Sequence, residues 1–483
     1  MFNRELWRFT SSRSTGWLTP RVSSSPARIK YARNRKSWGG AASLVAVLGA
    51  VLAPLPAHPT DKAPLTLRIE ADDVAATNAM EKVAQEYESK TGVRIVVEKF
   101  GYASSMEKAS QDLASKAGQY DIIIQNGDAL RTFASNGSIL NVDALEKLSG
   151  AKADFENDLF AGAWRGLSWY KGKRYGYPLA ANTMLVVYRR DLIENPREKQ
   201  AFRERYGYDL APPADWKQYR DLAEFFTRPE QGFYGTLLQG KRFPAVWFEW
   251  LNFAFSFGGG VMDKEYGWEY GPVIINSPAT VQATEFYQSL KAFSVPGVEH
   301  FTWDDAVDQM RQGHIFMCLM WSDALSHLVD PATSRVVGKL GYAPIPAGKA
   351  GRVAQIAGST YFVSRYSSHP KESFLFELWM MGRENQISQE VAGGASARRS
   401  VFKNPQVVAL PYAEASAQSL VVARSMIDTI PEAPQVSDII ETAVSDVLSG
   451  KQSSKEALDR AAIELNQTLG PKAPLRYPAA AAR

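Results

Sequence analysis

The sequence predicts an α/β protein built from two lobes. The chain has 483 residues, and a single hydrophobic core stops growing near about 250 to 300 residues, so two cores are expected. From Leu65 onward strand patterns alternate with helix patterns, which indicates a parallel sheet. The alternation begins again after Tyr188, which indicates a second α/β unit. Apolar residues at 45% and charged residues at 22% are ordinary for a soluble globular protein.

The first fifty-odd residues have the composition of an export signal. Residues 1–36 carry nine basic side chains and one acidic one, and the apolar run "AASLVAVLGAVLAPL" and then "PAH" follow. This order predicts a signal peptide over residues 1–57, cut after Ala57. The apolar run is shorter than the ~20 residues that a transmembrane helix needs, and Pro54 and Pro56 end it. The long basic region leaves open a start downstream of Met1 or a retained tether.

Removal of this leader reverses the sign of the net charge. Residues 1–57 hold nine of the 55 basic residues and one of the 51 acidic residues, so the remainder has a net charge of −4. A nucleic-acid partner is therefore not expected. The only cysteine, Cys318, lies in the apolar run "IFMCLMW" and is expected to be buried. The five histidines are scattered without metal-ligand spacing, so neither a metal nor a cofactor is predicted.

The first unit is predicted to bind a ligand at one edge of its sheet. Strands are expected over 65–71, 93–100 and 120–126, with helices over 75–92 and 104–118 between them. Ligands bind beyond the carboxyl ends of parallel strands. The polar and aromatic residues at those ends are the candidate contacts, although loop ends are usually polar for other reasons. They are Asp72, Asp73, Tyr102, Gln125, Asn126 and Asp128.

The second unit begins with the stretch "YGYPLAANTMLVVYRRDL". Pro178 favours an extended conformation at Tyr177, and a strand follows over 184–188. Asp215 is expected to cap a helix that runs to Phe226. Further elements are predicted in this order: a helix that stops at Gly258–Gly260, a helix over 277–293, a helix that turns at Gly313 into a strand ending on Trp321, strands in "LGYAPIPAG" and "IAGSTYFVS", and helices from His369 onward, interrupted by the loop "GGASARRSVFKNP". Trp247 and Trp250 are expected to pack in the core.

Several motifs, in this order, resemble extracellular solute-binding proteins of family 1, the maltose-binding-like receptors of ABC importers. "RYGYPLAANTMLVVYRRDLI" and "APPADWKQYRDLAEFF" resemble the family's strand and helix-start motifs. "SFGGGVMD", "FMCLMWSDAL", "IAGSTYFVS" and "GGASARRSVF" resemble its Gly-Gly turn, its strand with a terminal tryptophan, its return strand and its late loop. The resemblance covers roughly Leu65 to Leu469. The chain departs from the family at Arg189-Arg190 and in "ASARRS", which puts the ligand in doubt but not the fold.

The resemblance implies a bilobal type II periplasmic binding protein, with two discontinuous α/β lobes joined by hinge strands that close on a ligand. The expected division is 1–57 signal peptide, 58–181 N-lobe, 182–354 C-lobe, 355–405 N-lobe return segment, 406–470 C-terminal helices of the C-lobe and 471–483 flexible tail. Pro178 is expected at the hinge. The expected partners are a small solute and the permease subunits of an inner-membrane ABC transporter, and the protein is expected to be a periplasmic monomer.

The resemblance also implies a set of ligand contacts. Asn182 aligns with a polar contact of the family, or else caps the hinge, and Trp321 aligns with a stacking residue. Sugars present apolar C–H faces to aromatic rings and hydroxyls to polar groups, so Trp321 beside Asp323 is an apt pair. Gly358 and Ser359 on the return strand would let a ligand approach the backbone. Arg398 in the late loop could pair with a carboxylate or hydroxyl, or be a solvated surface residue.

The function implied is capture of a carbohydrate or polyol for an ABC transporter. The arginines would instead suit a phosphorylated or acidic solute such as a glycerophosphodiester. A secreted carbohydrate-active enzyme is a competing class, because a pair of catalytic carboxylates has no sequence signature. The chain lacks the serine-hydrolase elbow, the zinc-protease pair and the phosphate loop, so no enzymatic activity is predicted. A ligand sensor for a membrane kinase is a further alternative.

Overall fold

The computed structural model describes residues 64–264, 267–425 and 430–479, without the side chains of Tyr102, Ala103, Asp128 and Ser425. The predicted signal peptide lies outside the described residues. Residues Asp61–Arg483 form one compact unit, and the description below concerns the described part of it. Within that part, the helices are too short or too polar to cross a membrane.

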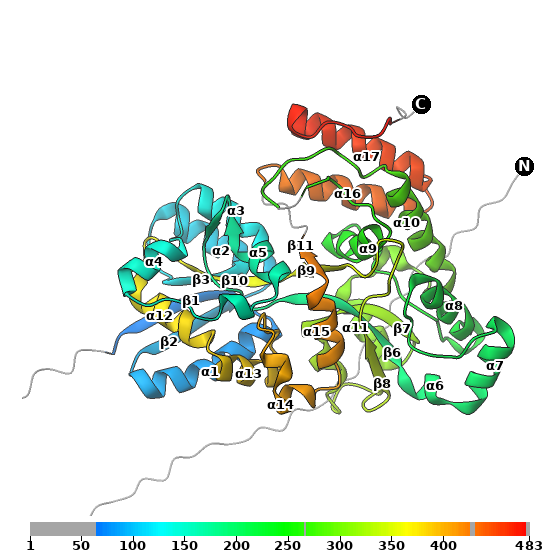
Figure 1. The fold of residues 1–483 in the computed structure, drawn as a ribbon, viewed down its shortest axis with the longest axis horizontal. Helices are drawn as coiled ribbons and strands as arrows, with labels where there is room; N and C mark the ends of the chain where they lie inside the picture. Colours follow the sequence, from blue (N-terminus) through cyan, green and yellow to red (C-terminus); the bar gives the residue numbers. More distant parts are fainter. Residues whose placement is uncertain (1–63, 265–266, 426–429, 480–483) are drawn as a thin grey trace, which may run out of the picture. The chain divides into compact units, whose positions relative to one another are not determined.

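The first sheet contains the three strands predicted from the start of the α/β pattern. β1 (Thr66–Asp72) lies between β2 (Arg94–Phe100) and β3 (Ile122–Asn126), and it is parallel to both. β10 (Ser359–Val363) joins from far along the chain and runs antiparallel to β3, which gives the order β10-β3-β1-β2 (Figure 1). Thus a late segment of the chain completes the first sheet, as a discontinuous lobe requires.

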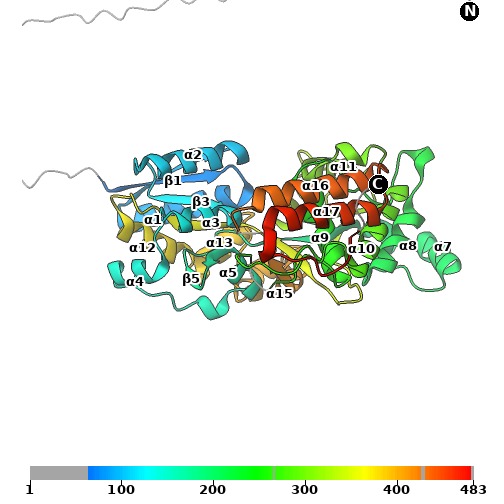
Figure 2. The same ribbon diagram turned by 90° about the horizontal axis from the view of Figure 1, so that it is seen from above.

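Helices cover both faces of this sheet. Ile122 and Ile124 pack with α1 (Ala75–Thr91) and α12 (Pro370–Met380), whereas Ile123 packs with α2 (Tyr102–Ser115) and α3 (Gly127–Ser135). This alternation follows from the two-residue period of a strand. Figure 2 shows α2 on one side of β1, and α1 and α12 on the other. The buried strands therefore leave only their ends free for a ligand.

The second sheet is built around β6 (Asn182–Arg189), the strand predicted after Pro178. β6 pairs antiparallel with β7 (Met317–Trp321), β8 (Leu340–Ala343) and β9 (Ala354–Ala357), and β9 pairs with β11 (Ala423–Ser425). One face carries α8 (Trp216–Phe226), α9 (Pro244–Ser256), α10 (Pro278–Ser289), α16 (Ala433–Leu448) and α17 (Ser454–Leu469), and the other carries α11 (Trp303–Gln312). Cys318 is buried and unpaired on the α11 side.

Local sequence signals set several of these boundaries. The Asp215 side chain accepts a hydrogen bond of 2.8 Å from the Gln218 backbone N–H, so the predicted cap of α8 is present. Thr302 and Asp305 form a capping box at the start of α11, and Gly313 ends this helix with a φ of 79°. This turn leads the chain into β7, so that Trp321 lies at the carboxyl end of that strand.

Two antiparallel segments cross between the sheets. In the first, Pro178 forms a bridge with Thr360, and Asn182 then pairs with Ala357. The second segment was expected as one strand over 356–364, but it forms two strands, with β9 in the second sheet and β10 in the first. Gly358 separates them at a φ of 151°, where a Cβ atom would lie 2.1 Å from the Ala180 carbonyl oxygen. Only glycine fits this close crossing.

The other helices and strands complete the two lobes. They are α4 (Val142–Ser149), α5 (Ala161–Ser168), β4 (Trp169–Tyr170), β5 (Lys173–Arg174), α6 (Arg190–Glu194), α7 (Pro196–Tyr206), α13 (Arg383–Val391), α14 (Pro405–Val408), α15 (Ala413–Val421) and the 3₁₀ helix η5 (Ser322–Leu328). The segment expected as a flexible tail is held as far as residue 479: Ala473 is buried, Leu475 bridges to Val273, and the Asn276 amide donates to the Tyr477 and Pro478 carbonyls.

Candidate functional site

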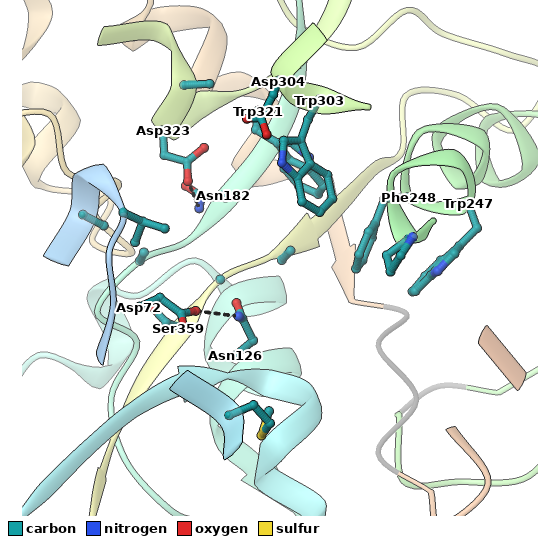
Figure 3. Close-up of a pocket in the computed structure, with 18 of the residues that line it drawn as sticks. Asp72, Asn126, Asn182, Trp247, Phe248, Trp303, Asp304, Trp321, Asp323 and Ser359 are labelled. Carbon is teal, nitrogen blue, oxygen red and sulfur yellow. Dashed lines mark hydrogen bonds between the residues drawn. The ribbon is translucent and has the colours of Figure 1, made fainter. Parts of the chain in front are cut away.

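A cavity of about 1050 Å³ lies where the two sheets face each other (Figure 3). The ends of β1 and β3 and the start of α3 supply one wall. The start of β6, the end of β7, and α9, α11 and α16 supply the other, and the β9–β10 link lies between them. The cavity therefore occupies the carboxyl-end edge of the first sheet, where ligands of open α/β sheets bind.

Two strand ends supply an aspartate and an asparagine to the first wall. Asp72 ends β1 and is 6% exposed, and its Oδ2 accepts a hydrogen bond of 3.2 Å from Asn126 Nδ2 at the end of β3. Ser359 pairs with Asn126 in the strand register, so the return strand brings it to the same place. Asp73 follows on the exposed rim, where its Oδ1 accepts from Asn78. The wall thus presents fixed oxygen acceptors.

Asn182 and Asp323 are joined across the start of the second sheet. Asn182 Nδ2 donates to Asp323 Oδ2 at 2.8 Å, and Asn182 Oδ1 accepts from the Ser322 hydroxyl at 3.4 Å. Burial raises the pKa of the Asp323 carboxyl, while the backbone N–H groups of Asp323 and Ala324, the Asn182 amide and His327 oppose that rise. The carboxyl is thereby held in one orientation at the edge of the cavity.

Aromatic rings line the second wall. Trp247 and Phe248 are neighbours on α9, stacked with ring centroids 4.0 Å apart. Phe248 meets Trp321 edge-to-face at 5.6 Å. Trp303 begins α11 and packs against Phe243 at 5.0 Å. In Figure 3 these rings lie on the side of the cavity away from Asp72 and Asn126. The cavity consequently has an apolar aromatic wall opposite a polar one, an arrangement suited to a solute with C–H faces and hydroxyls.

Carboxylates dominate the charge of the lining. Among the described residues around the cavity, five aspartates (Asp72, Asp73, Asp304, Asp308 and Asp323) stand against two arginines (Arg131 and Arg311), and His327 lies with them. Arg311 pairs with Asp308 at 3.0 Å. Partial burial and then the neighbouring carboxyls of Asp305 and Asp308 raise the pKa of Asp304, and His327 opposes this. The field in this part of the cavity is therefore negative. No cluster of metal-ligating side chains occurs in the described ranges.

Comparison with protein families gives a direct assignment. The model of the bacterial extracellular solute-binding protein family matches residues 71–387. This chain belongs to that family. Its members are solute-binding proteins, and the resemblance predicted from the sequence motifs is confirmed.

Individual solute-binding proteins match over most of the chain. A probable ABC transporter-binding protein of Deinococcus radiodurans is 27% identical over 59% of this chain and 67% of its own length. A mannitol-binding protein of Pseudomonas aeruginosa is 26% identical over 65% of this chain and 73% of its own length. The crystal structure of a solute-binding protein of Agrobacterium radiobacter K84 in complex with ribitol is 25% identical, with a TM-score of 0.69 over 83% of this chain and 98% of that one. The predicted bilobal fold class is confirmed.

Most of the residues predicted as contacts line one cavity of this solute-binding protein. The structure brings together Asp72, Asp73, Asn126, Asn182, Trp321, Asp323, Gly358 and Ser359. The side chains of two other candidates, Tyr102 and Asp128, lie outside the described residues. Pro178, predicted at the hinge, lies where the first crossing segment leaves the first sheet.

Two predicted contacts lie away from the lining. Gln125 is 1% exposed and donates from Nε2 to both Glu70 carboxyl oxygens at 3.1 Å and to Ser105 Oγ at 2.6 Å, so its side chain belongs to a buried network behind Asn126. Strand alternation explains the difference, because neighbouring residues point to opposite faces. Arg398 donates to Asp158 Oδ2 at 2.9 Å and to the Met381 carbonyl at 2.7 Å. It therefore holds the late loop against the first unit.

Several lining residues were not selected from the sequence. Trp247 packs in the core as expected, at 9% exposed, and also lines the cavity. Trp250 is fully buried and donates to Thr284 at 2.9 Å. α9 is mostly apolar, and its polar residues Glu249, Asn252 and Ser256 are buried, so its sequence gave no indication of which face would meet a ligand. Trp303 and Asp304 lie at the start of the helix predicted before Gly313, and they are not among the contacts predicted from the sequence. A Trp-Asp pair at the beginning of a helix in an aromatic-rich chain is the signal that could have identified them.

Proposed function

We propose that this protein captures a small polyol or carbohydrate between its two lobes and delivers it to the permease of an ABC transporter. The observation that carries the proposal is the pairing of an aromatic wall with a polar wall in one cavity. C–H faces of the solute would stack on Trp321 and Phe248, and its hydroxyls would reach Asp72, Asn126 and Asp323. The mannitol-binding relative and the ribitol complex support this solute class.

Export and partner follow from the family and the leader. The basic and apolar order of residues 1–57 supports transport to the periplasm, and the family is described as extracellular. A monomer that closes around the solute would present a changed surface to the permease. The similarity to an ABC transporter-binding protein supports that partner. We propose a binding role without catalysis, since the relatives are binding proteins.

An acidic or phosphorylated solute is disfavoured by the charges on the cavity wall. Five aspartates would repel a phosphate. The arginines that suggested such a solute are used elsewhere: Arg189 pairs with Asp191 at 2.6 Å, Arg190 donates to the Gly338 carbonyl at 3.1 Å, and Arg398 pairs with Asp158. The charge balance therefore favours neutral or cationic solutes.

A thermal-shift screen followed by titration calorimetry tests the proposal. The panel contains D-mannitol, ribitol, D-tagatose and maltose, with glycerol 3-phosphate and a glycerophosphodiester as acidic comparisons. We expect saturable one-to-one binding of at least one polyol or sugar, and unchanged solute after prolonged incubation. Tight binding of only the acidic compounds would contradict the proposed class, and release of product would make the protein an enzyme.

A further inference from the structure

Carboxylates outnumber cationic side chains around the cavity, with five aspartates against Arg131, Arg311 and His327. Aspartate side chains can only accept hydrogen bonds when ionised. The amides beside two of them each use one hydrogen already, since Asn126 donates to Asp72 and Asn182 donates to Asp323. Of the two lining arginines, Arg311 is paired with Asp308, and Arg131 donates to Thr132 at 3.0 Å. The lining therefore favours a solute that brings positive charge and hydrogen-bond donors.

Gln239 adds a buried acceptor to the same lining. The residue lines the cavity and its exposed fraction is 0%. Its Nε2 lies 3.4 Å from the Leu319 carbonyl and 3.5 Å from Glu249 Oε1, and both of these partners are oxygens. The amide orientation is thereby fixed, with Oε1 turned from these partners, and Oε1 has no hydrogen-bond partner within the described part of the chain. A buried acceptor in this position needs a donor.

Two tryptophans at the cavity each lie within two residues of an aspartate. Trp303 precedes Asp304 at the start of α11, and Trp321 lies two residues before Asp323 at the end of β7 (Figure 3). The face of a tryptophan attracts a cation within about 6 Å of the ring centroid, and a nearby carboxylate adds to that attraction. A neutral hydroxyl donates one hydrogen, whereas an ammonium group donates three and accepts none.

We propose that the preferred solute is an amine-bearing sugar or polyol, whose ammonium group binds among Asp304, Asp323 and the adjacent tryptophans. The inference rests on the proposed function, because it assigns a charge to the solute of that same site. It accounts for the excess of carboxylates and the unpartnered Gln239 oxygen together. A neutral polyol would leave more of these acceptors without a hydrogen.

Matched neutral and cationic ligands test the inference by calorimetry at pH 7 and low salt. The pairs are D-mannitol with 1-amino-1-deoxy-D-mannitol and D-glucose with D-glucosamine, with N-acetyl-D-glucosamine as the uncharged amide. Hydrogen bonds to charged groups are stronger than neutral ones by about 1 kcal/mol, which is about fivefold in affinity. We expect the amine to bind about fivefold more tightly than its neutral partner, and added salt to reduce the difference.

Substitutions of the cavity aspartates show which carboxylates bind the ammonium group of the solute. Asp304→Asn should abolish the preference for the amine and leave the neutral ligand within a few-fold of wild type. Asp323→Asn should weaken both ligands, and the amine more, because Asp323 also receives hydroxyls of the solute. The control is Asp209→Asn, since Asp209 is exposed and outside the lining. Equal or weaker binding of the amines, or a preference that survives both cavity variants, overturns the inference and leaves the proposed function standing. Failure of every neutral and amine-bearing ligand to bind folded wild-type protein overturns both.

Discussion

Asn182 lies at the point where the first crossing strand reaches the cavity, and it is the residue that best separates ligand contact from scaffold. Asn182→Ala removes an amide from the lining and takes the donor from Asp323, which it meets at 2.8 Å. We expect affinity for the bound polyol or sugar to fall by about tenfold, because an unmet buried acceptor costs about 1–3 kcal/mol. Calorimetry measures the change.

The control for that substitution is Asn141→Ala. Asn141 caps α4 by accepting from the Ala144 N–H at 2.8 Å and lies outside the cavity lining. Its loss should lower the free energy of unfolding by about 1 kcal/mol without changing affinity. If Asn182→Ala behaves as this control does, Asn182 serves only the hinge.

Trp321 provides a second test of ligand contact. Trp321→Ala removes an aromatic face at the end of β7, so affinity should fall on the order of tenfold or more, since aromatic contacts are worth about 0.5–1.5 kcal/mol beyond the area they bury. Calorimetry gives the affinity. Trp379→Ala is the matched control, because Trp379 packs on Tyr87 outside the lining. Wild-type affinity in the Trp321 variant would contradict the proposed contact between the aromatic wall and the solute.

Individual contacts were predictable from the sequence where a strand end or a family motif marked them. Asp72, Asn126 and Trp321 each end a strand, so the topology alone places them at the cavity edge. Gln125 is adjacent to Asn126, yet its side chain donates a hydrogen bond to Glu70. Neighbouring residues of a strand point to opposite faces, so which of the two meets the cavity depends on the strand register. Trp303 and Gln239 come from a helix start and a loop, and the packing of the fold brings them to the cavity.

The crossing between β9 and β10 depends on a single glycine. At Gly358 an added Cβ would lie 2.1 Å from the Ala180 carbonyl oxygen, on a residue whose φ is 151°. Gly358→Ala should lower the free energy of unfolding by about 3 kcal/mol, as the sum of backbone strain and a steric clash. Denaturant unfolding measures this difference.

Gly137→Ala separates the two causes. Gly137 also has a positive φ, 67°, but no atom lies within 4 Å of its added Cβ. This variant should lose about 1 kcal/mol, from the backbone alone. Equal losses in the two variants would show that the crossing strands are not closely apposed at Gly358.

The elements themselves were predictable to within a few residues wherever periodicity was strong. β1, β2 and α1 begin and end close to their predicted limits, and the cap of α8 is the predicted Asp215. The sequence did not reveal that "IAGSTYFVS" divides between two sheets, because each half alone has an ordinary strand pattern. β11 is three residues long, too short to give a pattern.

Buried carboxyls make the stability of the protein depend on pH. Burial raises the pKa of Glu70, Glu249 and Glu390 from an ordinary 4.5 to about 7. The folded state therefore binds protons more tightly than the unfolded state, so this contribution is fully present below about pH 4.5 and is lost as pH rises through 7. We expect the melting temperature to fall between pH 5 and pH 8.

Glu390→Gln should reduce that fall. Glu390 is 2% exposed and accepts from the Ser396 N–H at 2.7 Å, a bond that a glutamine oxygen can also accept. The control is Glu384→Gln on the same helix, whose carboxylate is exposed and should leave the slope unchanged. Calorimetry at several pH values measures how the melting temperature changes with pH. The same change in wild type and in Glu390→Gln would contradict the argument that burial of Glu390 causes it.

The central claim is that a polyol or carbohydrate binds in the cavity between the two sheets. At about 1050 Å³ the cavity is slightly larger than the ~300–1,000 Å³ of ordinary ligand pockets, so closure of the lobes around the solute is expected. A crystal structure of the wild-type protein with the tightest-binding polyol or sugar is the most direct measurement. The account predicts the solute between Trp321 and Asp72, with hydrogen bonds to Asn182 or Asp323. A solute bound elsewhere, with this cavity unoccupied, would contradict it.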